Sequence, residues 1–101
     1  MIVIGSEYVA FEPVKLYDFN KYNIKDRDFI AVKNRREAVF ANANGVKFIV
    51  CDSLSLARQL QALANDYLFD SKIAVVVADD MELEDAIDAR IDAAIYKNVI
   101  F

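Results

Sequence analysis

Apolar positions along this chain follow two different periods, and the change between them falls near residue 52. Before that point, short β-branched or aromatic runs alternate with polar turn formers, which is typical of strands. Beyond it, leucines recur at helical spacing, as in Leu56, Leu60 and Leu63. The pattern predicts strands at the beginning of the chain and a succession of strands and helices after them.

The first 51 residues predict strands joined by turns. Apolar runs at 1–4 and 8–11 predict two short strands or one long bulged strand. The segment 14–27 mixes aromatic residues with turn formers and predicts an irregular connection. An antiparallel meander is expected over 29–51, because the Asn-Gly pair at Gly45 favours a tight hairpin. The strands of this meander are predicted at 29–32, 37–41 and 46–51, with a turn at 34–36.

The second half predicts a first helix and the central strand of the sheet. The helix covers 53–69, presents Leu60 and its neighbours on one face, and can be capped by Asp52 or Ser53. The run at 73–78 is apolar without alternation, which is typical of a strand covered on both faces. We expect this strand to lie parallel to the strand that precedes the helix.

A second helix opens at Asp79, where Glu82 completes a capping-box pattern. The segment 91–96 either continues the helical stripe or contains a further parallel strand at 93–96. The strand is favoured, because a polar residue before an apolar run is frequent at strand entry in βαβ units. The apolar residues 99–101 are expected to pack on the domain or on a partner.

These elements predict an α/β fold with an α+β-like start. The sheet is mixed, with an N-terminal antiparallel meander and a C-terminal βαβαβ parallel half, and the helices pack on the sheet. A length of 101 residues with 56% apolar composition fits a single globular domain over 1–101. No apolar run approaches the roughly 18 residues that a membrane helix needs. Together with one cysteine and no signal-peptide pattern, this predicts a cytoplasmic protein without a membrane partner.

The composition excludes several kinds of catalysis. The chain has no histidine, so it can form neither a histidine-based triad nor a histidine-ligated metal site. A single cysteine, Cys51, excludes thiolate zinc sites and internal disulfides, and we expect it to be a buried, inert thiol. The two glycines, Gly5 and Gly45, lie far apart, so a glycine-rich phosphate loop is also excluded.

Ligands of open α/β sheets bind at the carboxyl ends of parallel strands. Asp52, Asp79 and Asp80 follow predicted strands there, and Lys97 follows the last one. Carboxylates suit Mg²⁺ and a lysine can contact a phosphoryl oxygen, so these residues are a candidate Mg²⁺ site with Lys97 as the phosphate or ligand contact. In residue types the set resembles the pocket of phosphoacceptor receiver domains, although its order along the chain differs from that family. The other interpretation, which the sequence favours, is that the aspartates cap helices.

Charge is divided unevenly along the chain. Residues 15–36 hold seven basic and three acidic residues, a net charge of +4, whereas 79–92 holds one basic and seven acidic residues, a net charge of −6. Such polarity can orient association with a partner or with a second copy. The basic segment also contains four aromatic residues, Tyr17, Phe19, Tyr22 and Phe29. Aromatic residues among cations are typical of single-stranded nucleic-acid platforms.

We therefore expect a small, non-catalytic domain that acts by binding. It is expected to form a homodimer, to recognise a protein or a small ligand, and to need no cofactor. The first alternative is a Mg²⁺-dependent phosphoryl-transfer or phosphodiester-cleaving enzyme that uses Asp52, Asp79 and Asp80. The second is nucleic-acid binding through 15–36, which the net charge of −4 disfavours.

Overall fold

The computed structural model describes residues 1–25 and 27–100, and it contains one six-stranded sheet in the order β1-β6-β5-β4-β3-β2. Every strand pair in this sheet is parallel. The elements in chain order are β1 (Ile2–Ile4), β2 (Tyr17–Asp18), β3 (Phe29–Ala31), α1 (Arg35–Ala43), β4 (Phe48–Cys51), α2 (Leu54–Tyr67), β5 (Lys72–Val77), α3 (Asp80–Asp88), β6 (Ala93–Tyr96) and the 3₁₀ helix η1 (Lys97–Val99).

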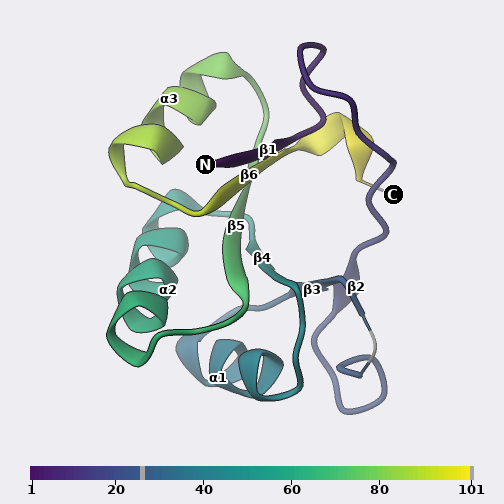
Figure 1. Cartoon of the computed structure of the whole chain (residues 1–101), viewed down its shortest axis with the longest axis vertical. Helices are drawn as coiled ribbons and strands as arrows, with labels where there is room; N and C mark the ends of the chain where they lie inside the picture. The colour runs from purple at the N-terminus through teal and green to yellow at the C-terminus, as the bar shows by residue number, and fades with distance from the viewer. Residues whose placement is uncertain (26, 101) are drawn as a thin grey trace.

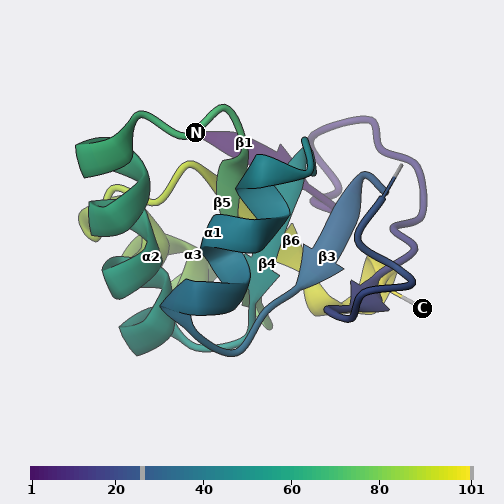
Figure 2. The same ribbon diagram turned by 90° about the horizontal axis from the view of Figure 1, so that it is seen from below.

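The three α-helices lie on one face of the sheet. From β3 to β6 each helix connects two adjacent strands, and every step moves in the same direction across the sheet. Right-handed crossovers that step in one direction keep their helices on one side. The three helices lie together in Figure 1, and the chain between β1 and β2 runs along the opposite side. Figure 2, turned by 90°, shows α1 and α2 beside each other against the sheet.

Strand alternation divides the core between the two faces of the sheet. Ile49 and Ile73 pack with Leu60 and other helical residues in the larger cluster. On the other face, Val50 and Ala74 belong to a smaller cluster, which the chain ends complete. All four residues of β4 are buried, and β5 lies between β4 and β6. The sequence prediction that the strand at 73–78 is central and parallel to its predecessor is therefore confirmed.

The two ends of the chain meet on the face without α-helices. Val14 forms an isolated parallel bridge with Ile100, and its backbone N–H donates to the carbonyl of Val99 at 2.9 Å. Val99 is buried in the smaller cluster. The apolar C-terminus thus packs on its own domain as far as the structure describes it, and Phe101 lies outside the described residues.

The antiparallel meander predicted over 29–51 is wrong. Strands β3 and β4 pair in parallel, from Phe29 with Phe48 to Ala31 with Val50. They are joined by helix α1, which contains the residues interpreted as a middle strand. The α/β class is correct, and the sheet is wholly parallel rather than mixed.

The physical reason lies at the two ends of α1. At its start, the side chain of Asn34 accepts a hydrogen bond from the backbone N–H of Glu37 at 2.9 Å, so the predicted turn at 34–36 is a helix cap. At its end, Gly45 has a φ of +75° and follows the last helical turn. A glycine in this conformation ends helices as readily as it turns hairpins.

Two further expectations concern the N-terminal segment and the last strand. Residues 8–11 form turns and irregular backbone instead of a strand, and the connection at 14–27 contains the short edge strand β2. The strand favoured at 93–96 is confirmed as β6. None of the helices in the described residues is long and apolar enough to span a membrane.

Candidate functional site

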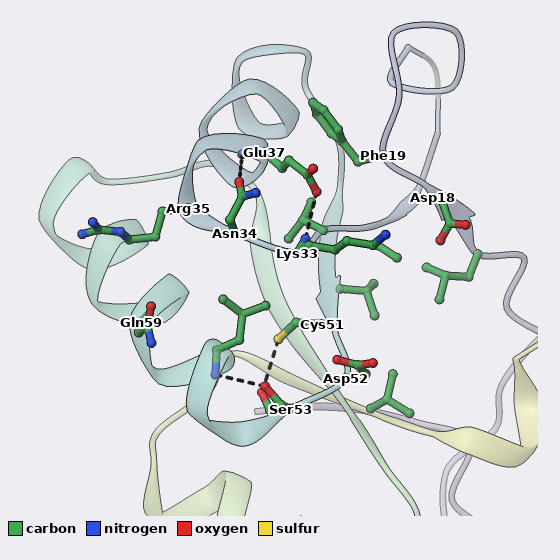
Figure 3. A pocket seen from close by; sticks show the side chains of 16 residues that line it. Asp18, Phe19, Lys33, Asn34, Arg35, Glu37, Cys51, Asp52, Ser53 and Gln59 are labelled. Carbon is green, nitrogen blue, oxygen red and sulfur yellow. Dashed lines mark hydrogen bonds between the residues drawn. The ribbon is translucent and has the colours of Figure 1, made fainter.

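A pocket of about 720 Å³ opens at the carboxyl ends of β2, β3 and β4. Its walls come from these strand ends and from the first turns of α1 and α2 (Figure 3). In open α/β sheets, ligand crevices lie at this end of the strands. The apolar floor on the sheet is formed by four side chains, Leu16, Ala31, Val50 and Val76.

Strand register places Asp18, Lys33 and Asp52 on the same face of the sheet. Asp18 pairs with Ala31, and Ala31 pairs with Val50 on the next strand. Lys33 lies two residues beyond Ala31, and Asp52 lies two residues beyond Val50. Because side chains alternate along a strand, all three face the pocket from neighbouring strands. Figure 3 shows the Lys33 side chain extending toward Asp18, with Asp52 on the other side of the opening.

The three charged side chains have no hydrogen-bond partner in the part of the chain that the structure describes. All three residues are exposed at the mouth of the pocket. Their charged ends are therefore available to a bound molecule, while the apolar floor lies beneath them.

The other polar residues of the pocket secure the helix starts. Asn34 caps α1, and Ser53 caps α2 by accepting from the backbone N–H of Leu56 at 3.2 Å. The Glu37 carboxylate accepts from the backbone N–H of Lys33 at 2.9 Å, which fixes the strand end that carries the lysine. The positive ends of both helix dipoles therefore face the pocket.

Cys51 is a packing residue of this wall. It is 2% exposed, and its Sγ lies 3.7 Å from the carbonyl oxygen of Ala74. Burial raises the pKa of the thiol to about 12. A thiol that stays protonated at neutral pH is a poor nucleophile, so the structure gives Cys51 no chemical role in the pocket.

Of the four residues proposed from the sequence, only Asp52 lines the pocket. Asp79 caps α3, where its Oδ1 accepts from the backbone N–H of Glu82 at 2.9 Å. Lys97 lies in η1, after the end of β6. Within residues 1–25 and 27–100, no group of three or more acidic, cysteine or histidine side chains is arranged to hold a metal ion. The Mg²⁺ site stays a prediction that only metal titration can test.

Asp80 has a structural contact of its own. Its Oδ1 accepts a hydrogen bond of 2.5 Å from the hydroxyl of Tyr96, which joins the first turn of α3 to the end of β6. This hydrogen bond is the main cause that raises the pKa of Tyr96 to about 12, with burial as the second cause.

Sequence reasoning missed Lys33 and Asp18. The sequence pattern did not place Lys33 at a site, because the residues after it were interpreted as a hairpin turn. It did not indicate Asp18 either, because the two-residue strand of Asp18 has no periodic pattern. The signal that could have found Lys33 is the spacing of Asn34 and Glu37, which marks a helix start. A helix there makes residue 33 the end of a strand.

The aromatic residues of the basic segment are mostly engaged in packing. The guanidinium of Arg27 lies over the ring of Tyr17, and its Cζ is 4.1 Å from the centroid of that ring. Phe29 stacks on Phe48 with centroids 4.9 Å apart. Tyr22, by contrast, is 81% exposed. The structure therefore offers no row of free aromatic faces in the described part of this segment.

Comparison with known proteins adds no functional assignment: no family model, curated protein or solved structure matches this chain.

Proposed function

We propose that this chain is a non-catalytic domain that binds a small polar molecule in the pocket over β2, β3 and β4. The observation that carries the proposal is the trio of Asp18, Lys33 and Asp52, which face one pocket from three adjacent strands without a hydrogen-bond partner among the described residues. A volume of about 720 Å³ falls within the range of small-molecule pockets, roughly 300–1,000 Å³. Charged groups above an apolar floor are the usual composition of such pockets.

A variant that fills the pocket tests this proposal. Ala31 lies on the pocket floor, so Ala31→Phe places a ring where the ligand would lie. Ala62→Phe makes the same change on the exposed side of α2 and serves as the matched control. Gln59→Trp narrows the pocket from its wall and provides a second variant if Ala31→Phe does not fold.

The measurement is a thermal-shift screen against amino acids, nucleotides, sugar phosphates and small carboxylic acids. At least one compound should raise the melting temperature of the wild type and of Ala62→Phe but not of Ala31→Phe or Gln59→Trp. The proposal is wrong if no compound stabilises the wild type, or if the stabilising compounds act equally on the filled variants.

We also propose self-association, because the sheet order turns the charge polarity of the sequence into a polarity in space. The acidic segment 79–92 contains α3 and adjoins the β1 edge of the sheet. The basic segment 15–36 contains β2 and β3 at the opposite edge. Opposite charges at the two edges favour contact between the acidic edge of one copy and the basic edge of another.

Sedimentation velocity at low micromolar concentration measures this association. Dimers and larger head-to-tail oligomers are expected at low salt, because each contact leaves one charged edge free. They should dissociate in 1 M salt, where the Debye length falls to about 3 Å. A monodisperse monomer at low salt would refute self-association and would leave the ligand-binding proposal intact.

A further inference from the structure

We infer that the pocket takes a zwitterion with an apolar side chain, a molecule of the free α-amino acid class. This inference rests on the ligand-binding function proposed above. It follows from three features of the same pocket: the order of the charges at its mouth, the sum of these charges with the helix ends, and the apolar floor beneath them.

The charges alternate from strand to strand. Asp18, Lys33 and Asp52 follow β2, β3 and β4, so the lysine lies between two carboxylates. Neighbouring strands are about 4.8 Å apart. A ligand that contacts both kinds of charge must therefore carry an ammonium and an anionic group within a few bonds of each other. An α-amino acid meets this requirement, because its two charged groups are attached to one carbon atom.

The sum of the charges also favours a ligand that is neutral overall. The charged side chains that line the pocket are Asp18, Lys33, Arg35, Glu37 and Asp52, and three carboxylates against two cations leave one negative charge. The first turns of α1 and α2 each contribute about half a positive charge. A phosphate would be attracted by Lys33 but repelled by Asp18 and Asp52. A diamine would be attracted by the two aspartates but repelled by Lys33. A zwitterion can place its ammonium on the aspartates and its carboxylate on the lysine without an unmatched charge.

The floor of the pocket selects the rest of the molecule. Leu16, Val50 and Val76 line it from the sheet, and Phe19 and Leu56 also line the pocket. Burying apolar ligand surface against such side chains is favourable in proportion to the area removed from water. A ligand with charges at one end and an apolar group at the other fits a charged mouth above an apolar floor.

Four probes separate these contributions in isothermal titration calorimetry. L-Phenylalanine carries both charges, phenylalaninamide lacks the carboxylate, N-acetylphenylalanine lacks the ammonium, and glycine lacks the apolar side chain. Phenylalanine should bind the wild type, and each of the other probes should bind about tenfold more weakly or worse, because each leaves a charged or apolar part of the pocket without a partner.

Single-charge variants then assign the two ends of the ligand. Lys33→Met should weaken phenylalanine about tenfold but should not weaken phenylalaninamide, since the amide has no carboxylate for the lysine to hold. Lys33→Arg should retain most of the affinity. Asp52→Asn should weaken phenylalanine but should not weaken N-acetylphenylalanine, which has no ammonium for the aspartate to hold. Lys97→Met removes a lysine after another strand, away from the pocket lining, and should change nothing.

Three results overturn the inference. The first is equal binding of phenylalanine and either single-charge derivative, and the second is an affinity for phenylalanine that Lys33→Met does not change. Absence of phenylalanine binding also overturns it. If the screen described above still finds another compound that Ala31→Phe blocks, the ligand-binding function stands and only the ligand class is wrong. If neither experiment finds a ligand, both fail.

Discussion

Replacement of Gly5 by alanine should destabilise the fold where the two chain ends meet. Gly5 follows β1 with a φ of +97°, a conformation that side chains with a Cβ rarely adopt. A Cβ built there would lie 2.8 Å from Cγ2 and 2.9 Å from Cγ1 of Val99, and 3.1 Å from Cβ of Tyr96. Val99 is buried in the smaller core cluster, so it has little room to move away.

The expected loss has two parts. Forcing an L-residue into the left-handed region costs about 1–2 kcal/mol, and overpacking a well-packed site costs about 1–3 kcal/mol more. The lower entropy of the unfolded alanine chain offsets about 0.4–1 kcal/mol. The free energy of unfolding should therefore fall by roughly 2–4 kcal/mol, which lowers the melting temperature by about 10 °C or more.

Gly45→Ala is the matched control, because Gly45 has a φ of +75° but no atom within 4 Å of an added Cβ. Its free energy of unfolding should fall only by the cost of the left-handed backbone conformation, about 1 kcal/mol or less after the entropy offset. Urea denaturation of both variants measures the difference, and Gly5→Ala in a Val99→Ala background isolates the steric contact. The packing of the chain ends is wrong if the two glycine variants are equally stable, or if Gly5→Ala is equally harmful in both backgrounds.

Three other predictions follow from contacts in the sheet and at the helix starts. Asp79→Asn should change the free energy of unfolding by about 1 kcal/mol or less, because asparagine is an equally good cap. Millimolar Mg²⁺ should not change the melting temperature, and a Mg²⁺-dependent rise that Asp79→Asn abolishes would support the metal site instead. Val75→Asp should unfold the protein, because it buries a charge in the core. Val76→Asp should remain folded, because Val76 faces the pocket. Circular dichroism of the two variants measures this difference. Tyr96 should ionise near pH 12 in an absorbance titration. Since folding raises this pKa from 10, the stability difference between wild type and Tyr96→Phe should be constant below pH 10 and shrink as pH rises through 12. Ionisation of Tyr96 near pH 10 would contradict its hydrogen bond to Asp80.

The C-terminal half could be predicted because its local signals agree with its tertiary structure. Strand β5 is apolar at consecutive positions since both of its faces are covered. Helix α2 buries Ala57, Leu60 and Ala64 at helical spacing, so its apolar stripe is visible in the sequence. The start of α3 is marked by Asp79 and Glu82, which form the predicted cap.

The N-terminal half could not be predicted, because α1 conceals its periodicity. Its buried residues are Ala38 and Ala41, whereas the larger Val39 and Phe40 are 44% and 47% exposed. A pattern read from large apolar side chains therefore follows the wrong face. The Asn-Gly pair that precedes β4 has the same left-handed glycine in a hairpin and in a helix terminus, so it cannot distinguish the two.

The same segment decides whether the proposed binding site exists at all. In the predicted meander, 37–41 lies between the strands that carry Lys33 and Asp52, which would separate these residues by two strand spacings, about 10 Å. In the structure 37–41 leaves the sheet as part of α1, and β3 pairs directly with β4. Lys33 and Asp52 then follow adjacent strands, and the N-terminus of α1 faces the pocket between them. The strand assignment therefore gave Lys33 no place beside Asp52 and left no room for the pocket, which explains why Asp52 is the only one of these two residues that the sequence identified.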